Sequence, residues 1–232
     1  IAAAPPTTKH GELRVYKLDV ETRARKHIAA GKKRGIIQGE TGSGKSANIA
    51  HMARLCLDKQ RRCLILADRR RLITQMGGML NTFEVPFGVI MAGETRHTHY
   101  PCIVASKDTI ASWGKRDFDM PDPFDLIMTD EAHRGMAESY QRLYKWWPNA
   151  VSVGFTATPA RADGKFLSDY FQWLECMVPS SQLIAEGWLI KPEVYVPLEL
   201  AKARKNGKRP KNLCGDPVSH WKLHAFGLPT IA

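Results

Sequence analysis

In the stretch Gly39-Glu40-Thr41-Gly42-Ser43-Gly44-Lys45-Ser46, every fixed position of the pattern G-x-x-x-x-G-K-[ST] is present. The stretch follows a short apolar run typical of a buried strand, residues 35–38, and precedes a segment of helical periodicity. Its glycines allow several backbone N–H groups to turn toward phosphate oxygens, and the following helix adds the positive end of its dipole. Such a match arises by accident in on the order of one per cent of chains of this length. The stretch therefore predicts a phosphate-binding loop.

The residue types of this loop predict individual roles. We expect Lys45 to reach the β- and γ-phosphates of a bound nucleotide and the Ser46 hydroxyl to ligate Mg²⁺. The nucleotide is also expected to contact the remaining residues of the loop, which are Gly39, Glu40, Thr41, Gly42, Ser43 and Gly44.

Short apolar runs alternate with longer stretches of helical periodicity from about residue 13 to residue 196, a pattern typical of βα units that build a mainly parallel sheet. The predicted strands are residues 35–38, 63–67, 87–91, 102–105, 126–129, 151–155 and 193–196. An apolar stripe after the first strand fits a helix that packs on the sheet, and it consists of Ile49, Met52, Ala53, Cys56 and Leu57. Another helix is expected to begin with Ser180 or Ser181 as its N-cap and to end at Gly187. The fold class is therefore α/β, a mainly parallel sheet flanked by helices.

Composition limits the class of protein and its partners. Lys and Arg outnumber Asp and Glu by 34 to 23, and a net charge of +11 attracts polyanions such as nucleic acid. The five cysteines are scattered without a C-x-x-C pair, which argues against a disulfide framework and a zinc site. No apolar run approaches the roughly 20 residues that a membrane-spanning helix needs. We expect a cytoplasmic protein without a membrane partner.

Two carboxylates, Asp130 and Glu131, follow the predicted strand 126–129 directly. Ligands of open α/β sheets gather at the carboxyl edge of the strands, where this pair would lie. Asp130 is suited to hold Mg²⁺ through a coordinated water, and Glu131 to orient or deprotonate the water that attacks the γ-phosphorus. An isolated pair of this kind is usually just solvated, but here it follows a phosphate-binding loop in the same α/β chain.

Three motifs in this order resemble motifs I, II and III of superfamily 2 helicases of the DEAD/DEAH type: the phosphate-binding loop, Asp130-Glu-Ala-His133 and Phe155-Thr-Ala-Thr-Pro-Ala-Arg161. Residues 63–75 resemble motif Ia, and residues 103–109 resemble the segment near motif Ib. The resemblance implies a RecA-like P-loop NTPase domain that uses ATP and Mg²⁺. In such helicases motif III couples hydrolysis to strand separation, which implies this role for Thr156 and Thr158, with His133 as their partner.

The resemblance also implies where nucleic acid binds. DNA is expected as the partner more than RNA, by analogy with phage and bacterial repair-type DEAH helicases. The expected contacts to the phosphate backbone are Arg69, Arg70, Arg71, Lys107 and Thr109. A solvated first helical turn is the alternative interpretation of the three arginines. Other cationic and aromatic residues are interpreted as surface charges or packing residues: Lys32, Lys33 and Arg34, and Trp113, Trp146, Trp147, Trp173 and Trp188.

One position departs from the family. Relatives carry L-R-x-Y-Q ahead of the loop, and the glutamine reads the adenine edge; here Leu13-Arg14-Val15-Tyr16 is followed by Lys17. Arg14 and Tyr16 are candidates to stack on or frame the base, or are packing or surface residues. Adenine selectivity is therefore open at this point.

The resemblance divides the chain into four parts. They are an N-terminal tail at 1–11, a first RecA-like domain at 12–198, a basic linker at 199–217 and the start of a second RecA-like domain at 218–232. Motifs IV to VI, with their arginine fingers, are absent from this sequence. We therefore expect the chain to bind ATP, to hydrolyse it weakly and not to unwind nucleic acid. A second RecA-like domain in cis is expected to complete the motor.

Two alternatives to a helicase motor stay open, and a third is disfavoured. A duplex translocase of a restriction or remodelling system carries the same motifs, and a non-catalytic nucleic-acid-binding remnant would retain the basic charge. A small-molecule kinase or GTPase is disfavoured, because no N-K-x-D base-reading motif is present.

Overall fold

A computed structural model of the chain describes residues 13–94, 97–113, 122–134, 145–159 and 170–191. The chain divides into two compact units, residues 1–189 and 190–232, and almost all the described residues belong to the first. The predicted strand 193–196, the basic linker 199–217 and the segment 218–232 lie outside the described residues, as do Ala160 and Arg161 of the predicted motif III.

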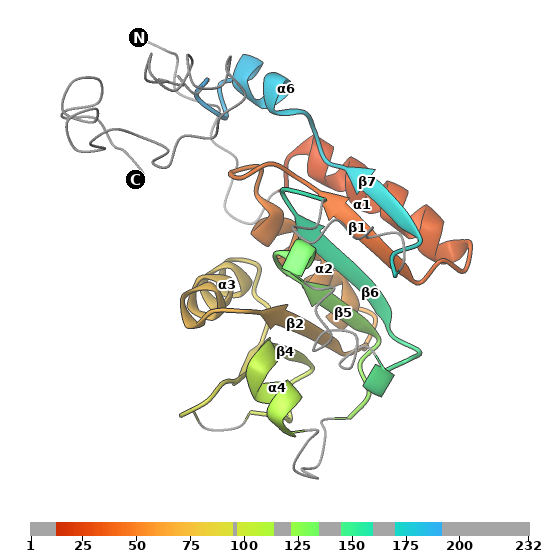
Figure 1. Cartoon of the computed structure of the whole chain (residues 1–232), viewed down its shortest axis with the longest axis vertical. Helices are drawn as coiled ribbons and strands as arrows, with labels where there is room; N and C mark the ends of the chain where they lie inside the picture. The colour runs from red at the N-terminus through yellow and green to blue at the C-terminus, as the bar shows by residue number, and fades with distance from the viewer. Residues whose placement is uncertain (1–12, 95–96, 114–121, 135–144, 160–169, 192–232) are drawn as a thin grey trace, which may run out of the picture. The chain divides into compact units, whose positions relative to one another are not determined.

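In the described part of the chain, seven strands form one sheet in the order β3-β4-β2-β5-β6-β1-β7, and every neighbouring pair is parallel (Figure 1). The strands are β1 Arg34–Gln38, β2 Cys63–Ala67, β3 Phe87–Ile90, β4 Cys102–Ser106, β5 Leu126–Thr129, β6 Val151–Thr156 and β7 Trp173–Cys176. The predicted fold class, a RecA-like domain built on a mainly parallel sheet, is confirmed. The first six predicted strands are present, with ends that differ by one residue at most.

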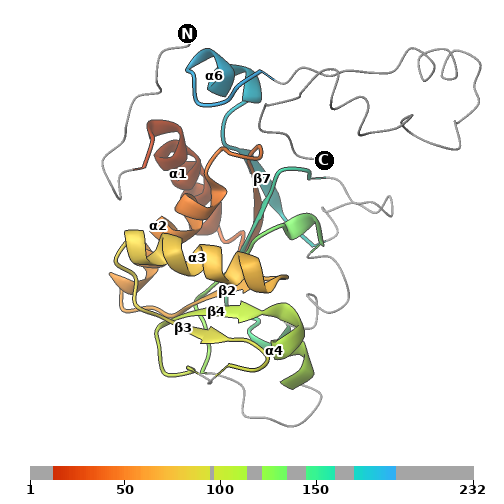
Figure 2. The same ribbon diagram turned by 90° about the vertical axis from the view of Figure 1, so that its left-hand side faces the viewer.

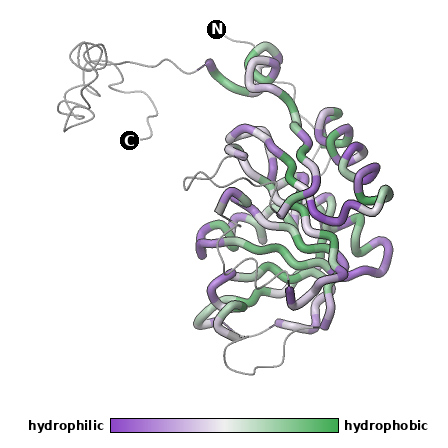
Figure 3. The backbone as a smooth tube through the Cα atoms, turned by 45° about the vertical axis from the view of Figure 1, so that its right-hand side comes forward, coloured by the Kyte–Doolittle hydropathy of each residue, from purple (hydrophilic) through white to green (hydrophobic). Residues whose placement is uncertain are grey.

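The strands are short and apolar because both faces of the sheet are covered. Side chains alternate between the faces, so Ile65 of β2 packs into one cluster while its neighbours Leu64 and Leu66 pack into another. The first cluster joins the sheet to α1 Val15–Ala29, α2 Lys45–Leu57 and α3 Arg70–Thr82. On the other face, Ile110 of α4 Lys107–Trp113 joins the second cluster (Figure 2). The central strands accordingly form the most hydrophobic part of the backbone in Figure 3.

The predicted apolar stripe of α2 faces the sheet. Ile49 and Ala53 are fully buried, and Met52 and Leu57 pack at the border of the same cluster. None of the described helices is long and apolar enough to cross a membrane.

Three local features differ from the expectations of the sequence. The helix α1 and the edge strand β7 were not predicted, and α6 Ser180–Ala185 has Pro179 rather than a serine as its N-cap. In α1 the buried positions include two charged residues, Lys17 and Glu21, beside Val20 and Ala24, so the apolar pattern of the helix is weak. Pro179 is extended, with φ −63° and ψ 145°, and no side chain caps α6, so the two serines occupy its first turn instead.

The buried sheet predicts that Ile65→Ala destabilises the domain strongly. Ile65 is fully buried, and removing its methyl groups leaves a cavity between β2 and the helices, which costs about 2–5 kcal/mol in free energy of unfolding. Urea unfolding followed by circular dichroism measures the change. Ile190→Ala is the matched control, because Ile190 is 94% exposed. An equal loss in both variants would contradict the packing described here.

Candidate functional site

The parallel order of three neighbouring strands brings the predicted motifs to one edge of the sheet. β6 lies between β5 and β1, and the chain leaves all three strands at their carboxyl ends. The phosphate-binding loop follows β1, the acidic pair follows β5, and Thr156 ends β6. The backbone N–H of Gly39 donates to the carbonyl of Thr156 at 2.9 Å, which joins the first and third motifs directly.

The phosphate-binding loop is a compact turn that runs into α2. Gly42 and Gly44 have φ of +83° and +87°, a left-handed conformation in which a residue with a side chain would be strained. Gly44 is the N-cap of α2, and no side chain caps its amino end. The Lys45 ammonium donates to the carbonyls of Gly39 and Glu40 at 2.9 and 3.2 Å. The amino end of α2 and the Lys45 ammonium therefore meet at one point, as a phosphate group requires.

The acidic pair lies close enough to this loop to interact with it. Asp130 is 9% exposed, and burial raises the pKa of its carboxyl. The backbone N–H of Glu131, at 3.0 Å, and the Lys45 ammonium lower this pKa, while the charges of Glu131 and Asp68 raise it further. A buried carboxylate surrounded by other carboxylates favours a bound cation, so Asp130 and the Ser46 hydroxyl fit the hard oxygen ligands that Mg²⁺ takes beside phosphates.

The predicted coupling residues are in contact. His133, in the short 3₁₀ helix η1 Ala132–Arg134, lies 3.0 Å through Nδ1 from the Thr156 hydroxyl and 3.3 Å from a carboxylate oxygen of Glu131. The Thr156 hydroxyl is fully buried and donates to the Thr158 carbonyl at 3.0 Å, while the Thr158 N–H donates back to it at 3.1 Å. A continuous chain of contacts therefore runs from the acidic pair to the loop after β6.

Arg14 and Tyr16 lie against the phosphate-binding loop. The Tyr16 hydroxyl donates to the Ser43 carbonyl at 2.8 Å and accepts from Arg14 at 3.1 Å. The Arg14 guanidinium lies 3.4 Å from the ring centroid of Trp188, which packs at the border of the core cluster as expected of a packing residue. Trp147 and Trp173 are buried, as expected of packing residues.

The predicted nucleic-acid contacts lie at the carboxyl edge of β2 and β4. Arg69 is the N-cap of α3, and it is exposed together with Arg70 and Arg71. Arg70 already pairs with Glu94 at 3.1 Å, and the ammonium of Lys107 lies 3.1 Å from Asp68. Thr109 is half-buried in the first turn of α4. Arg69 and Arg71 are therefore the more accessible cations of the predicted set.

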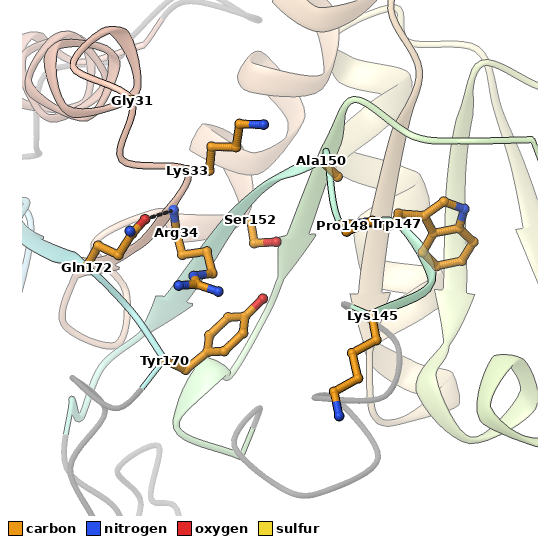
Figure 4. Close-up of a pocket in the computed structure, with 10 residues that line it drawn as sticks. All are labelled: Gly31, Lys33, Arg34, Lys145, Trp147, Pro148, Ala150, Ser152, Tyr170 and Gln172. Atoms are coloured by element: carbon orange, nitrogen blue, oxygen red, sulfur yellow. Dashed lines mark hydrogen bonds between the residues drawn. The ribbon is translucent and has the colours of Figure 1, made fainter.

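A basic pocket lies at the opposite end of β1, where the sequence indicated only surface charges. Lys33 and Arg34 line it together with Lys145 and Tyr170, and its volume is about 450 Å³ (Figure 4). The Arg34 guanidinium lies 4.8 Å from the centroid of the Tyr170 ring and covers its face. The length of β1 separates this pocket from the phosphate-binding loop, so it takes no part in the site.

One residue of the candidate site could not be placed there from the sequence. Lys17, which was noted only as a departure from a motif, is 7% exposed and lies with its ammonium against Gly44 of the phosphate-binding loop. No local pattern identifies this contact, because it joins two helices that are adjacent only in the fold.

Comparison with known proteins places these features in a family context. The family model described as type III restriction enzyme, res subunit, matches residues 10–161. The 51.5 kDa protein of a Lactococcus phage (isolate 7-9) is 27% identical over 212 residues, which are 84% of this chain and 42% of that protein. The chain therefore spans less than half the length of this relative.

Solved structures share the fold. The type ISP restriction-modification enzyme LlaGI, in complex with a DNA substrate mimic, matches 84% of this chain and 22% of its own with a TM-score of 0.59 and 18% identity. The UvsW helicase of bacteriophage T4 matches 75% of this chain and 64% of its own with a TM-score of 0.57 and 18% identity.

The contacts of Thr156 predict that Thr156→Val destabilises the domain by about 1–3 kcal/mol. The substitution keeps the shape of the side chain but leaves the N–H and carbonyl of Thr158 and the His133 ring without their partner. Urea unfolding measures the loss, and Thr156→Ser, which keeps the hydroxyl, is the control. Equal stability of the valine variant and the parent would show that the hydroxyl contacts contribute nothing.

Proposed function

The chain belongs to the type III restriction enzyme res subunit family, and from this premise we propose that it is the ATP-binding motor domain of a nucleic-acid helicase or translocase. The observation that carries the proposal is the meeting of Lys45, Asp130 and the His133–Thr156 contact at one edge of a single parallel sheet. A nucleotide bound at this edge touches the triphosphate-binding, metal-binding and coupling residues at once.

The proposed roles follow from the chemistry of each group. The N–H groups of residues 39–46 and the amino end of α2 bind the phosphates, and Lys45 exchanges the carbonyls of Gly39 and Glu40 for phosphate oxygens. Ser46 and Asp130 would hold Mg²⁺, which neutralises charge on the phosphates when it is bound. Glu131 orients the attacking water and accepts its proton.

The coupling proposal rests on the contacts of His133. Because its ring lies between Glu131 and Thr156, a change in the charge at the acidic pair changes a hydrogen bond at the end of β6. We propose that hydrolysis reaches the nucleic acid through this contact and through Thr158, which shares the Thr156 hydroxyl.

The proposed partner is nucleic acid, DNA in preference to RNA. A net charge of +11 attracts a polyanion, and Arg69 and Arg71 are exposed at the edge of the sheet that also holds the ATP site. LlaGI, which shares the fold, was solved with a DNA substrate mimic, and this supports DNA as the partner. Phosphate contacts of this kind position a duplex or a single strand without reading its sequence.

A duplex translocase of a restriction system is the second candidate function. Its support is the family itself and the likeness in fold to LlaGI, a restriction-modification enzyme. The two functions differ in whether the strands separate. A triplex-displacement assay beside a forked-duplex unwinding assay, on a chain that also carries a second RecA-like domain, distinguishes them: a translocase displaces the third strand but leaves the fork intact.

We further propose that a second RecA-like domain completes the ATP site. The Glu131 side chain is 37% exposed, so solvent reaches the acidic pair, and a covering domain would exclude that solvent and supply cations. Accordingly, the 232-residue chain should bind ATP with slow hydrolysis.

The proposed site predicts different effects for two substitutions. Lys45→Ala should abolish ATP binding, because it removes the ammonium at the amino end of α2. Glu131→Gln should retain ATP binding but lower DNA-stimulated hydrolysis by about 100-fold or more, the usual contribution of a general base. Fluorescent-nucleotide binding and phosphate release, with and without DNA, measure both effects. Lys59→Ala, at an exposed position after α2, is the control.

Two results would contradict the proposed function. One is ATP binding that survives Lys45→Ala. The other is the absence of any stimulation by DNA in a chain that carries both RecA-like domains, which would favour a non-catalytic remnant.

A further inference from the structure

The ammonium of Lys17 lies against the phosphate-binding loop, although the residue belongs to the first turn of α1. A Cβ atom on Gly44 would collide with the Lys17 Nζ, so only glycine leaves room for this contact. Two further contacts hold the turn in place: Tyr16 bonds to the Ser43 carbonyl, and the Lys17 carbonyl accepts from Asn48 of α2 at 3.1 Å. The backbone of this turn is therefore held against the phosphate-binding loop and α2.

The ammonium has no acceptor among the described residues. Lys17 is 7% exposed, and the part of the chain that the structure describes contains neither a hydrogen bond nor an ion pair of its Nζ. The one carboxylate that attracts it, Glu21, is already bound by Asn48, His51 and Arg25. The Lys17 Nζ lies 6.0 Å from the centroid of the Tyr16 ring, and a bound anion would give this cation a charged partner.

The nearest place for such an anion is the phosphate-binding loop itself. Gly44 is the N-cap of α2, and the N–H groups that follow it point to the phosphates of a bound nucleotide. We propose that Lys17 is a second phosphate-binding cation beside Lys45, and that the site consequently takes nucleoside triphosphates with little regard to their base. This inference rests on the proposed ATP site and names its substrate class.

The chemistry of lysine supports recognition of phosphate over recognition of a base. An ammonium carries three donors and no acceptor, so it cannot receive the amino group that adenine presents. Phosphate oxygens accept only, and a charged donor forms its strongest hydrogen bonds with them. Arg14 does not replace Lys17, because its guanidinium is held by Trp188 and the Tyr16 hydroxyl.

Binding of ATP, GTP, CTP, UTP and inorganic tripolyphosphate to the 232-residue chain tests the proposal. We expect the four nucleotides to bind within a few-fold of one another. Lys17→Met should weaken all of them, and tripolyphosphate, by about tenfold or more, the usual effect of losing one charge-assisted hydrogen bond. Lys17→Arg should retain most of the affinity. Lys26→Met, at an exposed position of the same helix, is the matched control and should change nothing.

The possible failures are distinguishable. If Lys17→Met changes the ratio of ATP to GTP affinity but leaves tripolyphosphate unaffected, Lys17 reads the base and the proposal is wrong. It is also wrong if Lys17→Met binds every ligand as tightly as the parent. If no ligand binds the parent chain, or if Lys45→Ala binds as the parent does, the ATP site itself fails.

The free protein offers a pH test of the same contact. Burial, and next the repulsion of Arg14, lower the pKa of Lys17 from 10.5 to about 8, while Glu21 raises it. The unfolded chain therefore binds more protons than the folded chain between these two values. The contribution of Lys17 to the free energy of unfolding of the parent accordingly rises with pH across this window. Lys17→Met should be more stable than the parent at pH 7, and its advantage should shrink between pH 8 and 10.5.

Urea unfolding of both chains without nucleotide, at pH 7 to 10, measures this difference, and other titrating groups cancel in the comparison. The substitution then raises stability while it lowers nucleotide affinity, a combination that a merely structural role of Lys17 would not produce. A constant difference between the two chains over this range would show that the folded chain does not lower the pKa of Lys17, and would overturn the proposal.

Discussion

The parallel pairing of β6 between β5 and β1 is the constraint on which the site depends. Register fixes Thr129 opposite Gly154 and Gln38 opposite Thr156, so the residues that follow β5, β6 and β1 emerge side by side. The hydrogen bond from Gly39 to Thr156 continues this register beyond the strands. Because a slip by one residue would turn the side chains to the opposite face of the sheet, the buried alternation of Ile65 with its neighbours also holds the chemistry in position.

Polar contacts attach the start of α1 to this framework in addition to the buried Val20 and Ala24. Glu21 is 1% exposed and binds Asn48 and His51 of α2, and its pKa is raised by burial against the opposing effect of those two partners. Tyr16 bonds to the loop between β1 and α2. The start of helix α1 therefore depends on the correct position of α2 and the loop, and the three elements form one unit around the candidate site.

Burial of the strands in the apolar core and polar contacts between distant segments differ in how far the sequence predicts them. Strands buried on both faces carry an apolar signal in their own residues, so β2 and β4 were recognisable without neighbours. The phosphate-binding loop and the acidic pair were recognisable because their residue types and spacing carry the chemistry. The edge strand β7 has an alternating burial pattern interrupted by Glu175, which pairs with His27 of α1 at 2.9 Å. Such a residue is explained only by a contact distant in sequence, as are the positions of Lys17 and Trp188.

Several cations of the free domain lie near the amino end of α2. The free domain places Lys17 and Lys45 close to the positive end of the α2 dipole, with Arg14 near enough to Lys17 to lower its pKa. Arg14 and Lys17 repel each other in the free domain, and in the site we propose a bound triphosphate would offset this repulsion. Since α1, the loop and α2 share these residues, a nucleotide bound at the proposed site would stabilise the contact between the two helices as well as fill the site. By this proposal the nucleotide would be linked to the stability of the surrounding fold as well as to the acidic pair.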